Sequence, residues 1–127
     1  MSDHFSLLND HQYMSLTTYR KDGTPKPTPV WFYDNNDTLF VLTNSDSYKV
    51  KRIRNNSDVQ VAPCDARGSL LSDEIATGQA QIVEPHTERG QYMNEKLIQK
   101  YGLLYRAFRW MGKLRGSETV FIEIEPR

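Results

Sequence analysis

The sequence predicts a mainly β protein, a small antiparallel barrel of six strands with helical segments in two places. Runs rich in β-branched and aromatic residues recur along the chain, and tight-turn residues separate most of them. The chain has neither a Gly-x-Gly-x-x-Gly motif nor a Gly-Lys-Ser/Thr phosphate loop, which argues against a doubly wound nucleotide-binding sheet. Closing the sheet into a barrel would also remove its exposed edges.

The first part of the chain predicts a short amphipathic helix or arm at residues 3–10 and a strand at residues 12–20. The Asp-Gly pair in residues 21–24 is typical of a hairpin turn, so the next strand, residues 26–33, should return antiparallel. Its prolines cannot donate ladder hydrogen bonds, which indicates an edge strand, a bulge or the wall of a cavity.

After a turn at residues 34–37, a third strand is predicted at residues 38–43. A fourth strand follows at residues 59–64. Residues 74–84 predict a long fifth strand, in which Gly78 suggests a bulge or a tight barrel bend.

The last part of the chain predicts a helix at residues 87–100, an interruption at Gly102 and a second helix at residues 103–114. The aromatic residues of this segment are expected in the core or on a dimer surface. Residues 119–125 alternate cleanly and predict the final strand.

The whole chain, residues 1–127, is long enough for one core, and we expect a single domain. Its 16 Lys and Arg residues balance 16 Asp and Glu residues, so no general attraction to nucleic acid is expected. The lone Cys64 excludes an internal disulfide. With no secretory leader and no apolar run of membrane-spanning length, we expect a cytoplasmic protein without a membrane partner.

The side chains that perform catalysis in other enzymes form no recognisable pattern here. His4, His11 and His86 are scattered and Cys64 has no nearby partner, so we expect no metal site. The sequence also lacks a convincing Ser-His-Asp, Cys-His or paired-carboxylate arrangement, and the catalytic residues stay unknown.

The most informative stretch is residues 43–54, where the third strand runs into a short basic helix. Residues 44–47 supply turn and helix-capping chemistry, and four cations then follow within six residues: Lys49, Lys51, Arg52 and Arg54. A helix start combined with cations favours an anion, so this junction is a candidate phosphate site. A solvated basic face and a nucleic-acid contact are the alternatives.

Four linked motifs resemble the pyridoxamine 5′-phosphate oxidase-like, FMN-binding split barrels, and most closely the branch of deazaflavin (coenzyme F-420)-dependent oxidoreductases. The motifs are LTTYRKDGTP at residues 16–25, TPVWF at 28–32, KVKRIR at 49–54 and VAPCDARG at 61–68. The resemblance covers about residues 13–124. It implies a homodimer of six-stranded split barrels, with two cofactor sites at the interface.

The resemblance also implies which residues hold the cofactor. Lys49 would be the chief phosphate cation, and Lys51 or Arg52 would contact the phosphate or the other chain. The remaining residues implied at the site are Thr43, Asn44, Ser47 and Tyr48 near the phosphate, and Thr28, Pro29, Val30 and Trp31 along the ring system. A flat apolar slot with a few amide groups suits a flavin ring, and charge-assisted hydrogen bonds suit its phosphate.

The function implied is an oxidoreductase in which the bound cofactor carries hydride to a small substrate that the sequence does not identify. FMN is the first choice of cofactor and the deazaflavin coenzyme F-420 the second. A non-catalytic flavin or haem carrier or stress protein is a further alternative. Vitamin B6 oxidase activity is not expected, because the C-terminal arginine and histidine segment of the true oxidases has no match here.

Overall fold

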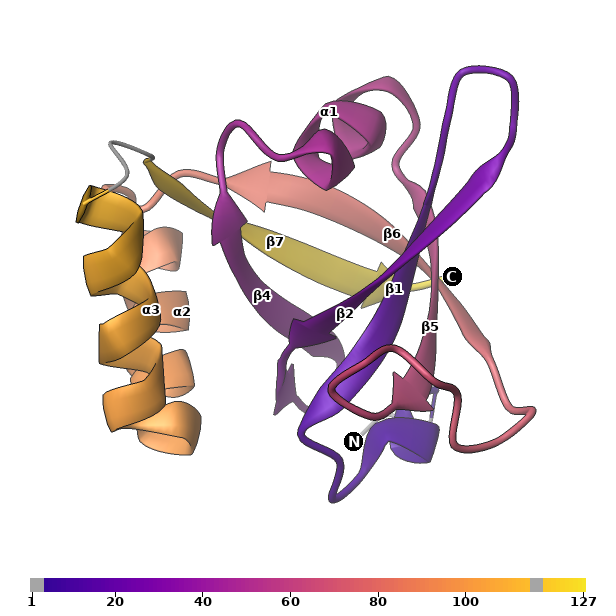
Figure 1. The fold of residues 1–127 in the computed structure, drawn as a ribbon, viewed down its shortest axis with the longest axis horizontal. Helices are drawn as coiled ribbons and strands as arrows, with labels where there is room; N and C mark the ends of the chain where they lie inside the picture. Colours follow the sequence, from indigo (N-terminus) through magenta and orange to yellow (C-terminus); the bar gives the residue numbers. More distant parts are fainter. Residues whose placement is uncertain (1–3, 115–117) are drawn as a thin grey trace.

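Seven antiparallel strands form one curled sheet in the computed structural model, which describes residues 4–114 and 118–127 (Figure 1). The strands are β1 (Tyr13–Tyr19), β2 (Pro25–Trp31), β3 (Tyr33–Asn35), β4 (Thr38–Asn44), β5 (Asp58–Cys64), β6 (Ala76–Val83) and β7 (Thr119–Pro126). Their order across the sheet is β2-β1-β5-β6-β7-β4-β3. The predicted antiparallel split barrel is thereby confirmed.

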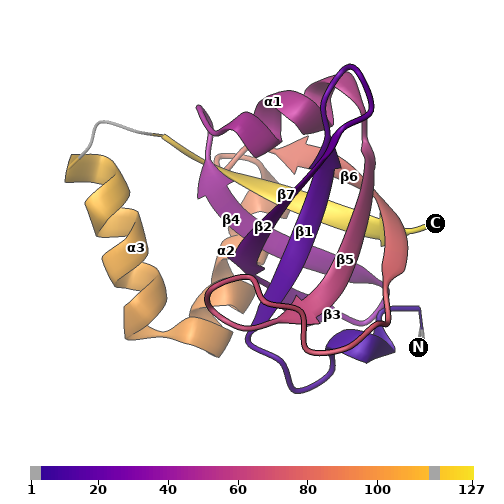
Figure 2. The same ribbon diagram turned by 45° about the vertical axis from the view of Figure 1, so that its right-hand side comes forward.

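Four helical segments accompany the sheet: η1 (Ser6–Leu8), α1 (Tyr48–Asn55), α2 (Glu88–Tyr101) and α3 (Leu103–Leu114). In the two views, α1 lies across one end of the curled sheet and η1 lies toward the other end, while α2 and α3 lie together on one side (Figures 1 and 2). Each helix begins within two residues of its predicted start, apart from η1, which is one short turn.

The prediction of six strands is wrong by one, because the segment predicted as residues 26–33 divides at Phe32. The backbone N–H of Phe32 donates to the hydroxyl of Tyr101, at 2.8 Å, instead of to a neighbouring strand. The chain therefore leaves β1 after Trp31. The next residues form β3, which pairs with β4 from Tyr33 opposite Phe40 onward.

The strand β2 lies at an edge of the sheet, as its prolines predicted. It pairs with β1 over its full length, from Trp31 opposite Tyr13 to Pro25 opposite Tyr19. The other edge is β3, which follows β2 directly in the chain. The two free edges of the curled sheet thus meet at Phe32, and this seam is where the barrel is split.

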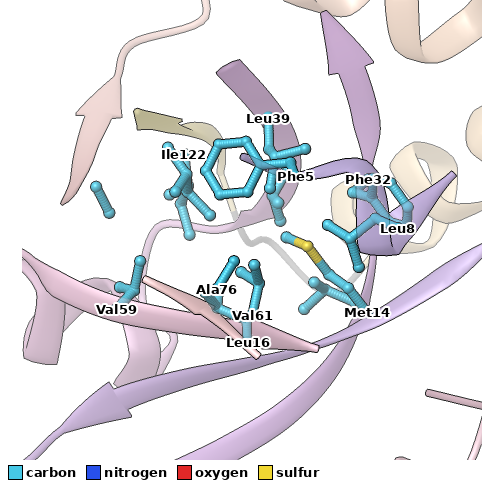
Figure 3. Close-up of a cluster of buried hydrophobic side chains, with 14 of the residues drawn as sticks. Phe5, Leu8, Met14, Leu16, Phe32, Leu39, Val59, Val61, Ala76 and Ile122 are labelled. Atoms are coloured by element: carbon cyan, nitrogen blue, oxygen red, sulfur yellow. The ribbon is translucent and has the colours of Figure 1, made fainter. Parts of the chain in front are cut away.

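Apolar side chains fill the inside of the curled sheet (Figure 3). The labelled residues of this cluster are Phe5, Leu8, Met14, Leu16, Phe32, Leu39, Val59, Val61, Ala76 and Ile122. Phe5 and Leu8 come from the N-terminal arm, which confirms that the arm serves packing. A second cluster joins the outer face of β4 and β7 to α2 and α3; its buried members are Phe40, Val83, Met93, Leu97, Tyr101, Tyr105 and Phe121.

Gly78 marks a close approach of two strands. The register of β6 runs through it without interruption, with Val59 opposite on β5 and Pro126 opposite on β7. A Cβ atom at this position would lie 2.6 Å from Cγ2 of Ile124 and 2.8 Å from the carbonyl oxygen of Glu125. Of the two interpretations offered by the sequence, the tight bend is the one that the structure favours.

Tyr101, the last residue of α2, fixes the helices to the seam of the barrel. Besides accepting from Phe32 N–H, its hydroxyl lies 2.5 Å from the carbonyl oxygen of Phe32 and 3.0 Å from that of Gln12. Burial raises the pKa of Tyr101, so the hydroxyl stays protonated and available as a donor. Its ring stacks on Trp31, with centroids 5.0 Å apart.

Replacing Tyr101 with phenylalanine is therefore expected to lower the free energy of unfolding by about 1–3 kcal/mol, because the buried N–H of Phe32 loses its acceptor. Urea denaturation measures the change. Tyr92→Phe is the matched control, because the Tyr92 hydroxyl donates only to the exposed Asn35 side chain. A loss as small as that of the control would show that the Tyr101 hydroxyl does not hold the seam.

Candidate functional site

A cavity of about 300 Å³ lies between the seam strand β2, the end of β4, the start of α1 and the helices α2 and α3. Its walls are Tyr13, Pro29, Val30, Trp31, Leu42, Thr43, Asn44, Lys49, Leu97, Tyr105 and Phe108. Six of the predicted site residues lie on these walls: Pro29, Val30, Trp31, Thr43, Asn44 and Lys49. The volume is at the lower end of what a small-molecule site requires.

One end of the cavity is cationic. Among the residues that the structure describes, no carboxylate forms an ion pair with Lys49. Burial, together with the positive charge of Arg52, lowers the pKa of Lys49. The ammonium group is thus half-buried without a counter-charge, an arrangement that an anionic ligand would stabilise.

The start of α1 adds to the positive character of this end. Ser47 occupies the N-cap position, but its side chain makes no capping hydrogen bond to the helix, and the first turn contains no acidic residue. The N–H groups of the first turn therefore have no side-chain acceptor, and the positive end of the helix dipole is not neutralised. Both features favour an anion beside Lys49.

Polar groups from the end of β4 surround the same point. The side-chain oxygen of Asn44 is buried and has no hydrogen-bond partner among the described residues, so this amide is available to a bound molecule. The hydroxyls of Thr43 and Ser47 lie 3.4 Å apart, which places Ser47 directly behind the cavity wall. The predicted strand-to-helix junction thus gathers hydrogen-bonding groups around one cation.

Two arginines extend the cationic end outward. Nε of Arg52 donates to Oγ1 of Thr18 at 2.7 Å, which ties α1 to β1. Burial and the nearby Arg20 lower the pKa of Arg52. Arg52 therefore lies close enough to both Lys49 and Arg20 for their like charges to interact. Arg20 follows the end of β1 and was not among the predicted site residues, although it belongs to the first of the four motifs.

The other end of the cavity is aromatic. Trp31 stacks on Tyr101 on one side and meets the ring of Phe108, with centroids 5.9 Å apart and planes inclined at 53°. The hydroxyl of Tyr105 donates to Oδ1 of Asn94 at 2.5 Å. Burial raises the pKa of Tyr105 to about 12, although Arg109 opposes the rise. The phenol that lines this end of the cavity therefore stays uncharged.

Five of the predicted residues do not line this cavity: Thr28, Ser47, Tyr48, Lys51 and Arg52. Ser47 and Arg52 lie next to it, as described. Tyr48 is 74% exposed, and the ammonium group of Lys51 lies 5.2 Å from the centre of its ring. Their predicted contacts with a phosphate or with a second chain stay predictions.

The cavity walls that sequence reasoning missed come from segments far from the motifs. They are Tyr13, Leu42, Leu97, Tyr105 and Phe108. Leu42 follows from strand alternation, since it faces the same side of β4 as Phe40 and Asn44. The residues of α2 and α3 carry no comparable signal, because the sequence does not say which face of each helix meets the barrel.

A second cavity, of about 560 Å³, lies on the other side of Tyr101 and contains Lys100 and Asp34. The ammonium group of Lys100 already donates to the carbonyl oxygens of Phe32 at 2.7 Å and His11 at 3.3 Å. It also lies 3.9 Å from the centre of the Phe32 ring. Because this cation is held by the fold, we do not assign a phosphate to this cavity.

Lys100 is expected to react with acetic anhydride at lower pH than an ordinary lysine. Burial, opposed only in part by Asp34, lowers the pKa of Lys100 to about 8. Below this value the amine is protonated and unreactive, so labelling measured by mass spectrometry should rise through pH about 8. A rise only near 10.5, the ordinary value, would show that the amine is well solvated.

In the parts of the chain that the structure describes, His, Cys, Asp and Glu side chains form no group that could hold a metal ion. No helix within those parts is both long and apolar enough to cross a membrane.

The family model for pyridoxamine 5′-phosphate oxidase matches residues 3–127. The chain belongs to the pyridoxamine 5′-phosphate oxidase family. This result confirms the family inferred from the four sequence motifs. Proteins of the pyridoxamine 5′-phosphate oxidase family typically bind a flavin. No curated protein matches the sequence.

Solved structures of the same fold are similar over nearly the whole chain. The haem storage protein HutZ from Vibrio cholerae has a TM-score of 0.74 at 14% identity, covering 96% of this chain and 86% of that one. General Stress Protein 26 from Bacillus anthracis has a TM-score of 0.60 at 23% identity, with coverage of 95% and 84%. An F420 reductase has a TM-score of 0.62 at 22% identity, with coverage of 100% and 95%. At these identities the likeness shows the fold.

Proposed function

We propose that the protein is an FMN-binding oxidoreductase that transfers hydride, through its cofactor, to a small substrate. The observation that carries this proposal is the cavity with an uncompensated cation, Lys49, at one end and an aromatic slot at the other. FMN has the matching polarity, with a charged phosphate tail and a flat, mostly apolar ring system. When bound, the flavin supplies the hydride chemistry.

The phosphate is proposed to lie at the start of α1. Lys49 would hold it by a charge-assisted hydrogen bond, and the N–H groups of the first helical turn would add neutral donors. Thr43 and Asn44 would contact the adjoining part of the ligand, since both line the cavity at this end. Arg52, which lies next to the cavity and not on its walls, would add to the positive electrostatic potential at the phosphate.

The ring system is proposed to lie along β2. Pro29 and Trp31 share the outer face of this edge strand, and Val30 points toward the core, where it is buried. These residues would orient the ring, and the apolar walls would exclude water from its reactive face. Thr28 does not line the cavity, and its predicted contact along the ring system stays a prediction.

A second copy of the chain is proposed to complete the site. A groove of about 300 Å³ on the outer face of the barrel contains Pro25 and Pro27. These prolines alternate along β2 with the same parity as Pro29, so the groove and the cofactor cavity lie on one face of this strand. Leu70, Leu71 and Ile75 are exposed beside the groove and would provide apolar contact area.

Light scattering tests the proposed homodimer, and a stable monomer at micromolar concentration would contradict it. Four aromatic residues suggested a dimer surface in the sequence: Tyr101, Tyr105, Phe108 and Trp110. Tyr101 and Tyr105 are buried within the protomer and are not available to a partner, whereas Phe108 and Trp110 are exposed. The cytoplasmic location stays part of the proposal.

The deazaflavin coenzyme F-420 is the second cofactor candidate, and the fold similarity to an F420 reductase supports including it. A haem carrier or a non-catalytic stress protein is tested in the same experiment. The described walls of the cavity contain no His, Cys or Met side chain, so Tyr13 and Tyr105 are the side chains there of a type known as an axial haem ligand.

The decisive experiment compares FMN with riboflavin, which has the same ring system and no phosphate. Titration of the apoprotein, followed by quenching of flavin fluorescence, should show FMN binding roughly ten- to a hundredfold more tightly, the effect of one charge-assisted contact. Equal affinities would overturn the phosphate assignment at Lys49. Tight binding of haem or of F-420 with weak binding of FMN would overturn the choice of cofactor.

Turnover separates the oxidoreductase from a carrier. Protein loaded with FMN should be reduced by a reduced nicotinamide cofactor or a reduced deazaflavin, and then reoxidised by an electron acceptor, in repeated cycles. Tight binding without any turnover would favour a carrier.

A further inference from the structure

The helix α3 presents an apolar face to solvent. At 100° per residue, positions 103, 104, 107, 108, 110 and 111 fall on one half of the helix. Large apolar side chains occupy most of these positions and are exposed, with Leu103 82% and Trp110 62% accessible. An amphipathic helix normally turns its apolar face to the core, whereas α3 turns this face to solvent.

The other half of α3 is basic, apart from the buried Tyr105. Arg106 and Arg109 lie on this half in the 100° projection. Arg109 is anchored because it donates to Oδ1 of Asn94 at 2.7 Å, whereas Arg106 is exposed. The helix therefore carries an aromatic and aliphatic face bordered by cations.

The charge around α3 is one-sided, although the chain as a whole is neutral. Residues 96–111 contain four Lys and Arg residues and no Asp or Glu. In both views α3 lies at the outside of the molecule (Figures 1 and 2). A cationic, apolar and protruding helix has the composition of a segment that lies in a lipid–water interface.

We propose that α3 docks the protein on the surface of an anionic lipid bilayer, with Leu103, Trp110 and Met111 entering the headgroup region. The bordering arginines would meet lipid phosphates. This is surface binding rather than spanning, so it agrees with the absence of a membrane-crossing helix in the described residues. It departs from the expectation that the protein has no membrane partner.

Charge complementarity selects lipid over a second copy of the chain. In an isologous dimer built on α3, the partner surface would be the same helix, which has no Asp or Glu to meet the charge of Arg106. The chain offers a different apolar surface for dimerisation, around Leu70 and Ile75. Lipid headgroups supply both the negative charge and the apolar layer that this helix lacks.

The test is co-sedimentation of the full chain with vesicles. Vesicles of equal parts phosphatidylcholine and phosphatidylglycerol should retain the protein, vesicles of phosphatidylcholine alone should retain much less, and added salt should weaken retention. Replacing Leu103 and Trp110 together with serine should lower the partition coefficient by about tenfold or more, and Arg106→Gln by about fivefold. The emission of Trp110 should shift to the blue when vesicles bind.

The matched control removes an exposed cation elsewhere. Lys21→Gln, in the hairpin between β1 and β2, should change vesicle retention much less than Arg106→Gln, and circular dichroism should show that every variant is folded. Equal retention on neutral and anionic vesicles, or none on either, would overturn the proposal. In light scattering without lipid, a smaller particle for the Leu103 and Trp110 variant than for the wild type would also overturn it, because α3 would then be an interface between copies. Retention on RNA without retention on anionic vesicles would overturn it as well.

Discussion

Replacing Lys49 with alanine is expected to weaken FMN binding by roughly ten- to a hundredfold, the effect of losing one charge-assisted hydrogen bond to the phosphate. The affinity for riboflavin should change little, because riboflavin has no phosphate for this ammonium group to contact. Titration of both flavins against the wild-type and variant apoproteins measures the two effects. The comparison separates a phosphate contact from a general disturbance of the cavity.

Arg54→Ala is the matched control for this experiment. It removes one positive charge from the same helix, but Arg54 lies on another side of α1, where its guanidinium is 4.0 Å from the carboxylate of Glu84. We expect FMN affinity to fall by no more than about threefold, through the weaker long-range field. If Lys49→Ala behaves like Arg54→Ala, Lys49 is not the phosphate ligand.

Replacing Arg89 with methionine is expected to lower the free energy of unfolding by about 3 kcal/mol at neutral pH, as breaking a buried ion pair does. Glu123, in the middle of β7, is only 4% exposed. Nε and Nη2 of Arg89 donate to its two carboxylate oxygens at 3.1 and 2.5 Å. The guanidinium also lies 5.2 Å from the centre of the Phe40 ring. The expected loss of about 3 kcal/mol is at the lower end of the range for breaking a buried ion pair, because Arg89 is itself half-exposed.

The pH dependence of the free energy of unfolding shows whether the charge of Glu123 causes the loss of stability in Arg89→Met. Burial alone would raise the pKa of Glu123, but hydrogen bonds and positive charge from Arg89, with a hydrogen bond from Gln81, bring it below its ordinary value. In the wild type this carboxylate therefore stabilises the fold above its ordinary pKa, and the contribution disappears as pH falls through the lowered pKa. Without Arg89, only weaker hydrogen bonds such as that from Gln81 oppose the effect of burial on the pKa of Glu123, so the variant should lose less stability in mild acid than at neutral pH.

Urea denaturation at the two pH values measures this difference. Adding Glu123→Gln to Arg89→Met should restore much of the lost stability, because a neutral amide is less costly to bury than an unpaired carboxylate. If the double variant is no more stable than Arg89→Met, the loss comes from packing around Phe40 instead of from the charge.

Most of the fold follows from local patterns in the sequence. Each predicted strand has a counterpart, because alternation and turn residues such as Asp22-Gly23 act over a few neighbouring positions. The extra strand β3 was not predictable in this way. It exists because Tyr101, far along the chain, takes the hydrogen bonds of Phe32.

The candidate site likewise contains some residues that local sequence patterns predict and others that they do not. Lys49, Asn44 and Trp31 belong to motifs that are contiguous in sequence, and the structure brings them to one cavity. Tyr105 and Phe108 reach the site only through tertiary packing. Their contribution depends on the curl of the sheet and on the docking of α2 and α3, which no short motif encodes.

The prolines of β2 have a consequence for how copies of this protein can meet. Pro25, Pro27 and Pro29 recur at every second residue, yet the pairing with β1 is continuous. Because a proline nitrogen cannot donate, the intervening residues must make the bonds to β1, and all three proline nitrogens lie on the free side of the strand. That side cannot template another strand, so the molecule is protected there against edge-to-edge aggregation. A partner must associate through side chains, and the seam stays accessible to a small molecule.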